Sequence, residues 1–149
     1  MIIYRNAKRD DIDKILEIEK VSFPGPWGRV AFECEISKSL TGAGIFWVAE
    51  DEETGNICGY TCANIIIDYI HLLNLAVAPD YRKKGIASEF IRKIESAALK
   101  RNIYGITLEV RETNTAAINL YRKFGFDVKG NREKYYENRD NALIMWKLL

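Results

Sequence analysis

The sequence is poor in the residue types that build disulfide frameworks and metal sites. Its 149 residues include three cysteines, Cys34, Cys58 and Cys62, and one histidine, His71. An odd set of cysteines without a CxxC pair favours neither a disulfide framework nor a zinc site, so we expect no metal. Cys58 and Cys62 lie an even number of residues apart in a strand-like run. We therefore expect them to share a face and to pack as small apolar groups.

Long apolar runs and an excess of one charge are also missing. No stretch approaches the roughly 20 apolar residues that a membrane span requires. The opening MIIYRNAKRDD lacks the apolar segment of a signal peptide. The net charge is only +1, so neither nucleic acid nor an anionic membrane is the expected main partner. With no repeat, linker or low-complexity segment, the sequence predicts one cytoplasmic domain over residues 1–149.

What the chain does have is a local cluster of three cations at residues 82–84, directly before Gly85. Apolar residues recur every three or four positions from Ile86 to Ala98, which predicts a helix that begins at or just after Gly85. Cations at a helix N-terminus are unfavourable, because the free N–H groups there already carry partial positive charge. An anion bound at the helix end makes the same arrangement favourable. The cluster therefore predicts a phosphate-binding site.

Helical and strand-like periodicities alternate along the rest of the chain. Helices are predicted over residues 8–23, 30–38, 86–101 and 115–124, the first with Ile12, Ile15, Leu16 and Glu19 at helical spacing. Strands are predicted over residues 2–5, 45–51, 57–67, 69–78, 103–111, 126–136 and 141–149. The order β α α β β β α β α β β indicates an α/β (α+β) domain with a mixed sheet and about four helices.

Three motifs, in this order, resemble the GNAT superfamily of N-acetyltransferases. NLAVAPDYRKKGIA contains the acetyl-CoA signature [Q/R]-x-x-G-x-[G/A], and LEVRETN and INLYRKFGF follow it. The signature alone is a weak signal, but its place between a buried strand and a helix makes the combination specific. With FPGPW and the tail from KYYENRD, nearly the whole chain is similar to the RimI type, the ribosomal-protein-alanine N-acetyltransferases. The family's fold implies a sheet splayed between its fourth and fifth strands, here those ending at Val77 and beginning at Ile103.

The resemblance also implies where acetyl-CoA binds. The backbone of the fourth strand would bond the pantetheine arm, the loop before the third helix would hold the pyrophosphate, and the start of the last helix would add one contact. The residues so implied are Leu75, Ala76, Val77, Arg82, Lys83, Lys84, Gly85, Ile86, Ala87, Ser88 and Asn114. The anion expected at the basic cluster is therefore the diphosphate of coenzyme A. Ala87 replaces the commoner glycine of the signature, a variant that the signature admits.

The same resemblance implies Glu109 as the general base and Tyr121 as the general acid. Acetyl transfer to an amine needs a group that takes the ammonium proton and a group that protonates the departing thiolate, and these side chains suit both tasks. The Val77 N–H is a candidate donor to the carbonyl oxygen. From the residues alone, Glu109 could instead lie on a solvated strand face beside Arg111, and Tyr121 could be a core tyrosine.

The implied acceptor is the N-terminal amine of a protein with a small first residue such as Ala or Ser, a ribosomal protein among them. An α-amine is easier to deprotonate than lysine, because its reference pKa is lower by roughly 2.5 units, worth about 3.5 kcal/mol. We expect Pro26, Trp27, Tyr135 and Tyr136 to flank an extended peptide. The PGPW segment could equally be a rigid turn with Trp27 in the core.

Other acceptors and roles remain open at this stage. The acceptor could be a small amine or an internal lysine, and His71 and Tyr69, just before NLAV, could broaden the acceptor range. The protein could also be a non-catalytic sensor that binds acetyl-CoA, although an idle site needs neither Glu109 nor Tyr121. The sequence makes no prediction about a partner subunit.

Overall fold

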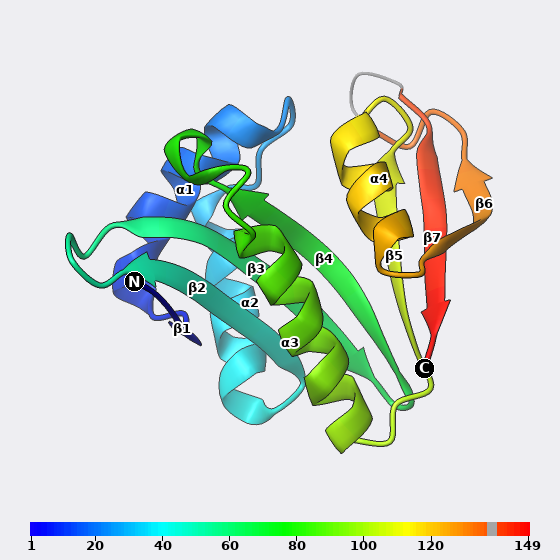
Figure 1. The fold of residues 1–149 in the computed structure, drawn as a ribbon, viewed down its shortest axis with the longest axis horizontal. Helices are drawn as coiled ribbons and strands as arrows, with labels where there is room; N and C mark the ends of the chain where they lie inside the picture. The colour runs from blue at the N-terminus through cyan, green and yellow to red at the C-terminus, as the bar shows by residue number, and fades with distance from the viewer. Residues whose placement is uncertain (137–139) are drawn as a thin grey trace.

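A seven-stranded mixed sheet forms the centre of the computed structural model, which describes residues 1–136 and 140–149. The strand order across the sheet is β1-β2-β3-β4-β5-β7-β6 (Figure 1). The strands are β1 Ile2–Asn6, β2 Gly44–Asp51, β3 Ile57–Ile66, β4 Tyr69–Val77, β5 Gly105–Arg111, β6 Asp127–Arg132 and β7 Ala142–Leu148. Only β4 and β5 run parallel, and every other neighbouring pair is antiparallel.

Two helices cover each face of the sheet. α1 (Ile12–Ser22) and α2 (Arg29–Thr41) lie on one face, and α3 (Ile86–Lys100) and α4 (Thr115–Lys123) lie on the other (Figure 1). Short 3-10 helices occur at Arg9–Asp11 and Pro79–Tyr81. The predicted order of elements and the mixed sheet are confirmed. The fifth strand begins at Gly105, two residues later than the sequence indicated.

The sheet splays between β4 and β5. Their ladder joins only Tyr69–Leu72 to Gly105–Leu108. The second half of β4 therefore does not pair with the end of β5. Leu73 marks the point of departure, because Cys62 faces Asn74 and Ala63 faces Leu72, which leaves Leu73 as the extra residue of a β-bulge. Figure 1 shows the two strands diverging from this point. The predicted splay is confirmed.

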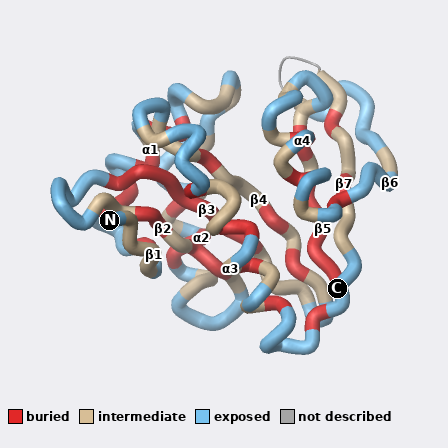
Figure 2. Tube along the Cα trace, viewed as in Figure 1, coloured by how far each residue is buried: buried red, intermediate tan, exposed pale blue. Residues whose placement is uncertain are grey.

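The core lies in layers on both faces of the sheet (Figure 2). Ile12, Ile15 and Ile18 of α1 pack with Phe32 of α2 against one face. On the other face, α3 contributes its apolar side chains at 86, 90, 91, 94 and 98, all buried. The buried stripe of α3 therefore fixes how the basic loop before it sits against the sheet.

The prediction that Cys58 and Cys62 share a face is wrong. Cys58 packs beside Phe90 of α3, whereas Cys62 packs with the α1 and α2 side chains on the opposite face. The pairing of β2 with β3 shifts between Ala49 and Glu50, so Cys58 is an extra residue there. A bulge adds one residue to a strand and reverses the alternation beyond it, which a period of two cannot predict.

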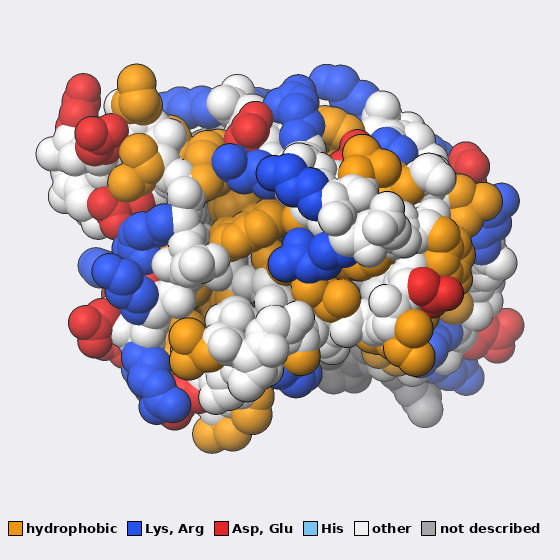
Figure 3. Space-filling model, turned by 90° about the horizontal axis from the view of Figure 1, so that it is seen from below, with side chains coloured by type: hydrophobic (Ala, Val, Ile, Leu, Met, Phe, Trp, Pro, Cys, Tyr) orange, Lys and Arg blue, Asp and Glu red, His pale blue; other side chains and the backbone are white. Residues whose placement is uncertain are grey.

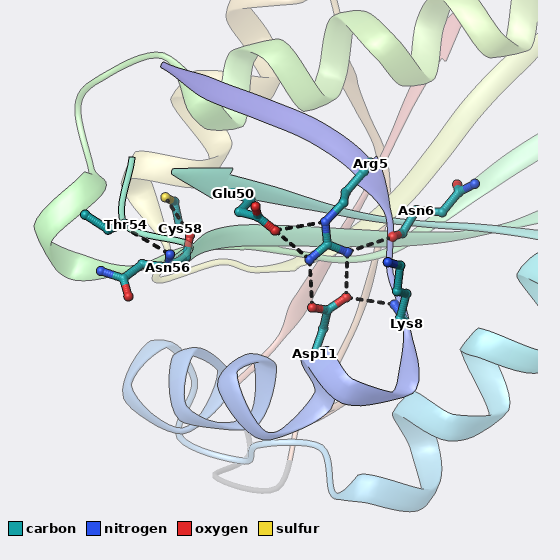
Figure 4. Close-up of polar contacts among 8 residues, drawn as sticks. All are labelled: Arg5, Asn6, Lys8, Asp11, Glu50, Thr54, Asn56 and Cys58. Atoms are coloured by element: carbon teal, nitrogen blue, oxygen red, sulfur yellow. Dashed lines mark hydrogen bonds and ion pairs between the residues drawn. The ribbon is translucent and has the colours of Figure 1, made fainter. Parts of the chain in front are cut away.

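Arg5 fastens the edge strand β1 to both the sheet and the first helical turn (Figure 4). Its guanidinium donates to both carboxylate oxygens of Asp11, at 2.8 and 2.9 Å, and to Glu50 of β2 at 2.8 Å. Asp11 also accepts from the Lys8 N–H at 2.8 Å. This bidentate, partly buried pair holds the start of α1 against the sheet.

Candidate active site

The separated ends of β4 and β5 enclose a cavity of about 500 Å³. Both strands, the end of α1, the α1–α2 loop, α4 and the segment after β6 contribute to its walls. Its lining residues are Glu19, Phe23, Gly25, Trp27, His71, Leu72, Leu73, Asn74, Leu75, Leu108, Glu109, Val110, Arg111, Asn114, Ala117, Tyr121, Tyr135 and Tyr136. The cavity therefore brings both predicted catalytic residues together with three of the four predicted acceptor residues.

Glu109 lies on β5 one residue beyond the last pair with β4, so its side chain faces the cavity. The side chain is 14% exposed, and Oε1 lies 3.5 Å from Nη2 of Arg132. A hydrogen bond to Glu109, together with burial, raises the pKa of Tyr135. The alternative pairing with Arg111 is not found, because Arg111 pairs with Asp140 at 3.4 Å. The segment that begins with β6 thus holds the Glu109 carboxylate.

Tyr121 is fixed by the C-terminus of α4. The Phe126 N–H donates to the Tyr121 carbonyl and the Gly125 N–H to the Arg122 carbonyl, both at 3.0 Å. These two bonds form a Schellman motif, and Gly125 takes the left-handed φ of 92° that the motif needs. Phe126 packs on the Tyr121 ring at 5.7 Å. Burial, with a smaller effect of Tyr136, raises the pKa of Tyr121, so its hydroxyl keeps its proton.

His71 is another titratable side chain that lines the cavity. It lies on β4 opposite Thr107 of β5 and lines the cavity. Burial lowers its pKa, an effect that Glu109 opposes and Arg132 reinforces. The imidazole is therefore neutral at pH 7.

Aromatic side chains form the walls on which an acceptor was predicted to bind. Tyr135 and Tyr136 pack edge to face at 5.1 Å, and the Arg111 guanidinium lies 4.0 Å from the Tyr136 ring centre. Trp27 lines the cavity and packs on Phe32 at 5.3 Å, so it contacts both the core and the cavity. Pro26 is exposed and does not line the cavity.

The predicted phosphate loop lies at the N-terminus of α3, outside the 500 Å³ cavity. Gly85 is the N-cap, with a φ of 84°. Because glycine has no side chain, it makes no side-chain capping bond to the first N–H groups of the helix. The Arg82 Nε donates to the Val77 carbonyl at 3.0 Å, which ties the loop to the end of β4. Lys84 lies over the Tyr81 ring at 5.4 Å. N–H groups that no side chain caps, with cations nearby, fit a pyrophosphate.

The remaining predicted cofactor contacts follow β4 toward this loop. Leu75 lines the cavity, whereas Ala76 and Val77 continue β4 beyond it and pair with β3. Asn114 lines the cavity and caps α4, because its Oδ1 accepts from the Ala117 N–H at 3.2 Å. The stretch of β4 that does not pair with β5 thus leads from the cavity to the loop at residues 82–88.

Sequence reasoning missed Glu19, which lines the cavity from α1 and is only 1% exposed. The signal was present, because Glu19 falls on the apolar face of α1 with Ile12 and Ile15. A carboxylate in that position must find hydrogen-bond donors inside the protein. The sequence also could not indicate Arg132 or Asp140, whose partners come from distant strands.

A second groove, of about 460 Å³, lies between β1 and α3. It is lined by Tyr4, Arg5, Asn6, Trp47, Lys93, Ser96, Ala97, Lys100 and Arg101. The view from below shows Lys and Arg side chains around an apolar hollow on this side of the molecule (Figure 3). The groove lies at the β1 edge of the sheet, away from the catalytic candidates on β5 and α4, and shares no lining residue with the main cavity.

Two further searches cover residues 1–136 and 140–149. Within them, no group of three or more His, Cys, Asp or Glu side chains is placed to hold a metal ion. Over the same residues, no helix has the length and apolar character of a membrane span.

Comparisons with known proteins agree with this geometry. The model of the Acetyltransferase (GNAT) family matches residues 12–126. A Bacillus subtilis protein provisionally named [ribosomal protein bS18]-alanine N-acetyltransferase is 34% identical over 143 residues, which cover 95% of this chain and 92% of the relative. A Sulfurisphaera tokodaii protein named N-alpha-acetyltransferase is 30% identical over 156 aligned positions, covering 95% and 89% of the two chains.

The solved structures give the same result. The crystal structure of the ribosomal-protein-S18-alanine N-acetyltransferase from Escherichia coli superposes with a TM-score of 0.88 at 25% identity. The match covers 99% of this chain and 94% of that chain. The chain belongs to the GNAT family of acetyltransferases and is an acyl-CoA-dependent acetyltransferase.

Proposed function

We propose that the protein acetylates the N-terminal α-amine of proteins with a small first residue such as Ala or Ser, a ribosomal protein among them, using acetyl-CoA. The observation that supports this most directly is the shared cavity. Glu109, Tyr121 and the aromatic walls formed by Trp27, Tyr135 and Tyr136 all face it. The relatives named for alanine and N-alpha acetylation support the acceptor class. The cytoplasm is the expected location.

The loop at residues 82–88 is the proposed pyrophosphate site, and the proposed pantetheine contacts are the backbone groups of Leu75, Ala76 and Val77. Acetyl-CoA supplies the acetyl thioester. The splay leaves backbone groups of β4 unpaired with β5, which makes them available to a ligand that is rich in amides. Asn114 is the proposed contact from α4. The Val77 N–H is the proposed donor to the carbonyl oxygen.

Glu109 is the proposed general base. An α-ammonium must lose a proton before it can attack, and a carboxylate in reach, directly or through water, can take that proton. Because Arg132 and Tyr135 both contact Glu109, the segment that flanks the acceptor also orients the proposed base. The neutral His71 nearby adds no second positive charge to that of Arg132.

Tyr121 is the proposed general acid. Its raised pKa keeps the hydroxyl protonated at pH 7, and the hydroxyl can donate to the departing thiolate. The Schellman motif fixes the backbone at the end of α4 that carries Tyr121, and Tyr121 lines the same cavity as Glu109. The two groups therefore approach the reacting atoms from β5 and from α4.

The test uses two peptides incubated with the protein and acetyl-CoA and read by intact-mass spectrometry. One peptide has a free N-terminal Ala or Ser, and the other has a blocked N-terminus and an internal lysine. We expect acetylation of the first peptide only, and loss of about 10²–10⁴ in rate with Glu109→Gln. The matched control is Glu112→Gln, which changes an exposed carboxylate three residues along and is expected to leave the rate unchanged.

Acetylation of the lysine peptide alone, or of free small amines alone, would contradict the proposed acceptor. Acetyl-CoA binding without transfer to any amine would indicate a sensor. An undiminished rate in Glu109→Gln would show that another group takes the proton.

A further inference from the structure

Glu19 is a buried carboxylate that the proposed reaction does not use. It lies on α1 with 1% exposure, yet its side chain borders the main cavity. No Lys, Arg or His pairs with it among the residues that the structure describes. Burying an ionised group without a partner cation is costly unless several donors surround it. The structure supplies those donors from three separate parts of the fold.

Three hydrogen bonds converge on the Glu19 carboxylate. Oε1 accepts from the Tyr60 hydroxyl of β3 and from Nδ2 of Asn74 on β4, the latter at 2.7 Å. Oε2 accepts from the backbone N–H of Trp27 at 2.9 Å. All three neighbours donate, so the ionised carboxylate, which only accepts, fits this site without conflict.

The network joins the acceptor side of the cavity to the cofactor side. Trp27 belongs to the α1–α2 loop, whose side chains form the acceptor wall. Asn74 follows the β4 bulge, and its Oδ1 accepts from the Leu75 N–H at 3.2 Å. The Asn74 carbonyl in turn accepts from the Thr61 hydroxyl at 2.8 Å. Glu19 therefore holds the loop and the bulge at a fixed distance from each other.

We propose that Glu19 is a positioning residue for the acceptor: its carboxylate anchors the Trp27 backbone and thereby fixes the wall against which the first residues of the acceptor peptide lie. The Trp27 backbone N–H is the donor, so the contact does not depend on the side chain at position 27. The proposal rests on the proposed function for its substrate, but the anchor itself is a property of the protein alone.

The sharpest test is Glu19→Gln, because glutamine keeps the shape and alters one oxygen. Its amide oxygen can still accept from Tyr60 and Asn74. Its NH₂ group then faces the Trp27 N–H, so a donor meets a donor and the anchor is lost. We expect the acceptor KM to rise about tenfold to a hundredfold, the effect of losing a hydrogen bond to a charged group. We expect kcat and the acetyl-CoA Kd to change less than about threefold.

Tyr60→Phe is the matched control. It removes a donor from the same carboxylate but leaves the Trp27 bond, and Tyr60 does not line the cavity. We expect it to lower the melting temperature without raising the acceptor KM. If Glu19 were only a stability element, both variants would lose stability and neither would show a selective rise in KM.

A second readout needs no activity. The chain has three tryptophans, and Trp47→Phe with Trp146→Phe leaves Trp27 as the single tryptophan. In that background we expect Glu19→Gln to increase acrylamide quenching of Trp27, because the loop is released. If the wild-type protein acetylated no peptide, the proposed function would fail and the quenching would decide this inference alone. Quenching that is unchanged in Glu19→Gln would overturn the inference. An equal rise in acceptor KM in Glu19→Gln and Tyr60→Phe would overturn it too.

Discussion

The Tyr121 hydroxyl is a group whose role can be separated from that of the ring. Tyr121→Phe keeps the ring packing on Phe126, so we expect the free energy of unfolding to change by no more than about 1.5 kcal/mol. If the hydroxyl donates the proton, kcat should fall about 10²-fold or more. Steady-state kinetics with the Ala peptide and urea unfolding measure the two effects.

The control for this change is Tyr104→Phe, an exposed tyrosine outside the cavity. Because Tyr104 lies outside the cavity and phenylalanine keeps its ring contact with Trp146, we expect neither kcat nor stability to change. A Tyr121→Phe variant with full kcat would make Tyr121 a core residue only, as the sequence alone allowed.

Gly59 permits the close approach of β3 and β4 because its side chain is only a hydrogen atom. A Cβ at this position would lie 2.8 Å from the Ala76 carbonyl oxygen, which is too close unless β4 shifts. We expect Gly59→Ala to destabilise the fold by about 1–3 kcal/mol and to weaken acetyl-CoA binding, because Ala76 is a proposed cofactor contact. Chemical unfolding and calorimetric titration with coenzyme A measure these effects.

Gly130→Ala is the comparison for this prediction. Its added Cβ would meet Ile144 at 3.7 Å, an ordinary contact, so we expect a change within about 0.5 kcal/mol. Equal effects of the two substitutions would show that strand propensity, not the approach to Ala76, governs Gly59.

The sequence predicted the cavity residues that lie in a motif and missed one that does not. Glu109, Tyr121 and Asn114 were predicted from LEVRETN and INLYRKFGF, and the fold places all three at one cavity. Glu19 was not predicted to be functional, because its donors come from β3, β4 and a loop. Contacts between elements far apart in the chain have no local signature.

At the scale of elements, the pair of Arg5 and Asp11 joins β1 to the start of α1. Burial raises the pKa of Asp11, but the hydrogen bonds from Arg5 and from the Lys8 N–H lower it by more, so the net shift is downward. A lowered folded pKa means that the pair stabilises the fold above the unfolded pKa of about 3.9. This stabilisation is lost as the pH falls through the folded value.

We therefore expect Asp11→Asn to reduce the free energy of unfolding by about 1–3 kcal/mol at pH 7. The difference from wild type should shrink as the pH falls below about 3.9. Urea unfolding across a pH series measures this. Asp10→Asn, an exposed neighbour in the same turn, should show no such difference, and a loss that persisted undiminished at low pH would contradict the ionic origin.

The elements themselves were largely predictable, whereas their irregularities were not. The helix α3 begins at Ile86 as its apolar spacing predicted. The bulge at Leu73 and the one at Cys58 depend on how two strands pair, and a single strand's periodicity does not contain that information. The bulge at Leu73 lies where β4 leaves β5, so the feature that opens the site is one that the periodicity could not show.

At the scale of the whole molecule, the splay predicts which parts a ligand should protect. A ligand that binds only the folded protein stabilises it by about 2.7 kcal/mol at one hundred times its Kd. We expect coenzyme A to raise the melting temperature and to slow hydrogen exchange at residues 73–77 and in the loop at residues 82–88. Protection at β1 should not change, because β1 lies three strands from the splay.

Hydrogen exchange with mass spectrometry, with and without coenzyme A, measures this pattern. Uniform slowing over the whole sheet would indicate global stabilisation alone. Slowing centred on the groove between β1 and α3 would place the ligand there instead.

The splay also separates the part of the molecule that is synthesised first from the part that is synthesised later. Residues up to 100 build β1 to β4 and three helices, and residues from 105 onward build β5 to β7 and α4. During synthesis the first part can therefore collapse while β4 is still a bare edge strand, which is a hazard for aggregation. Glu109 and Tyr121 both arrive with the second part. A nascent chain that has not yet produced β5 and α4 therefore lacks both proposed catalytic groups.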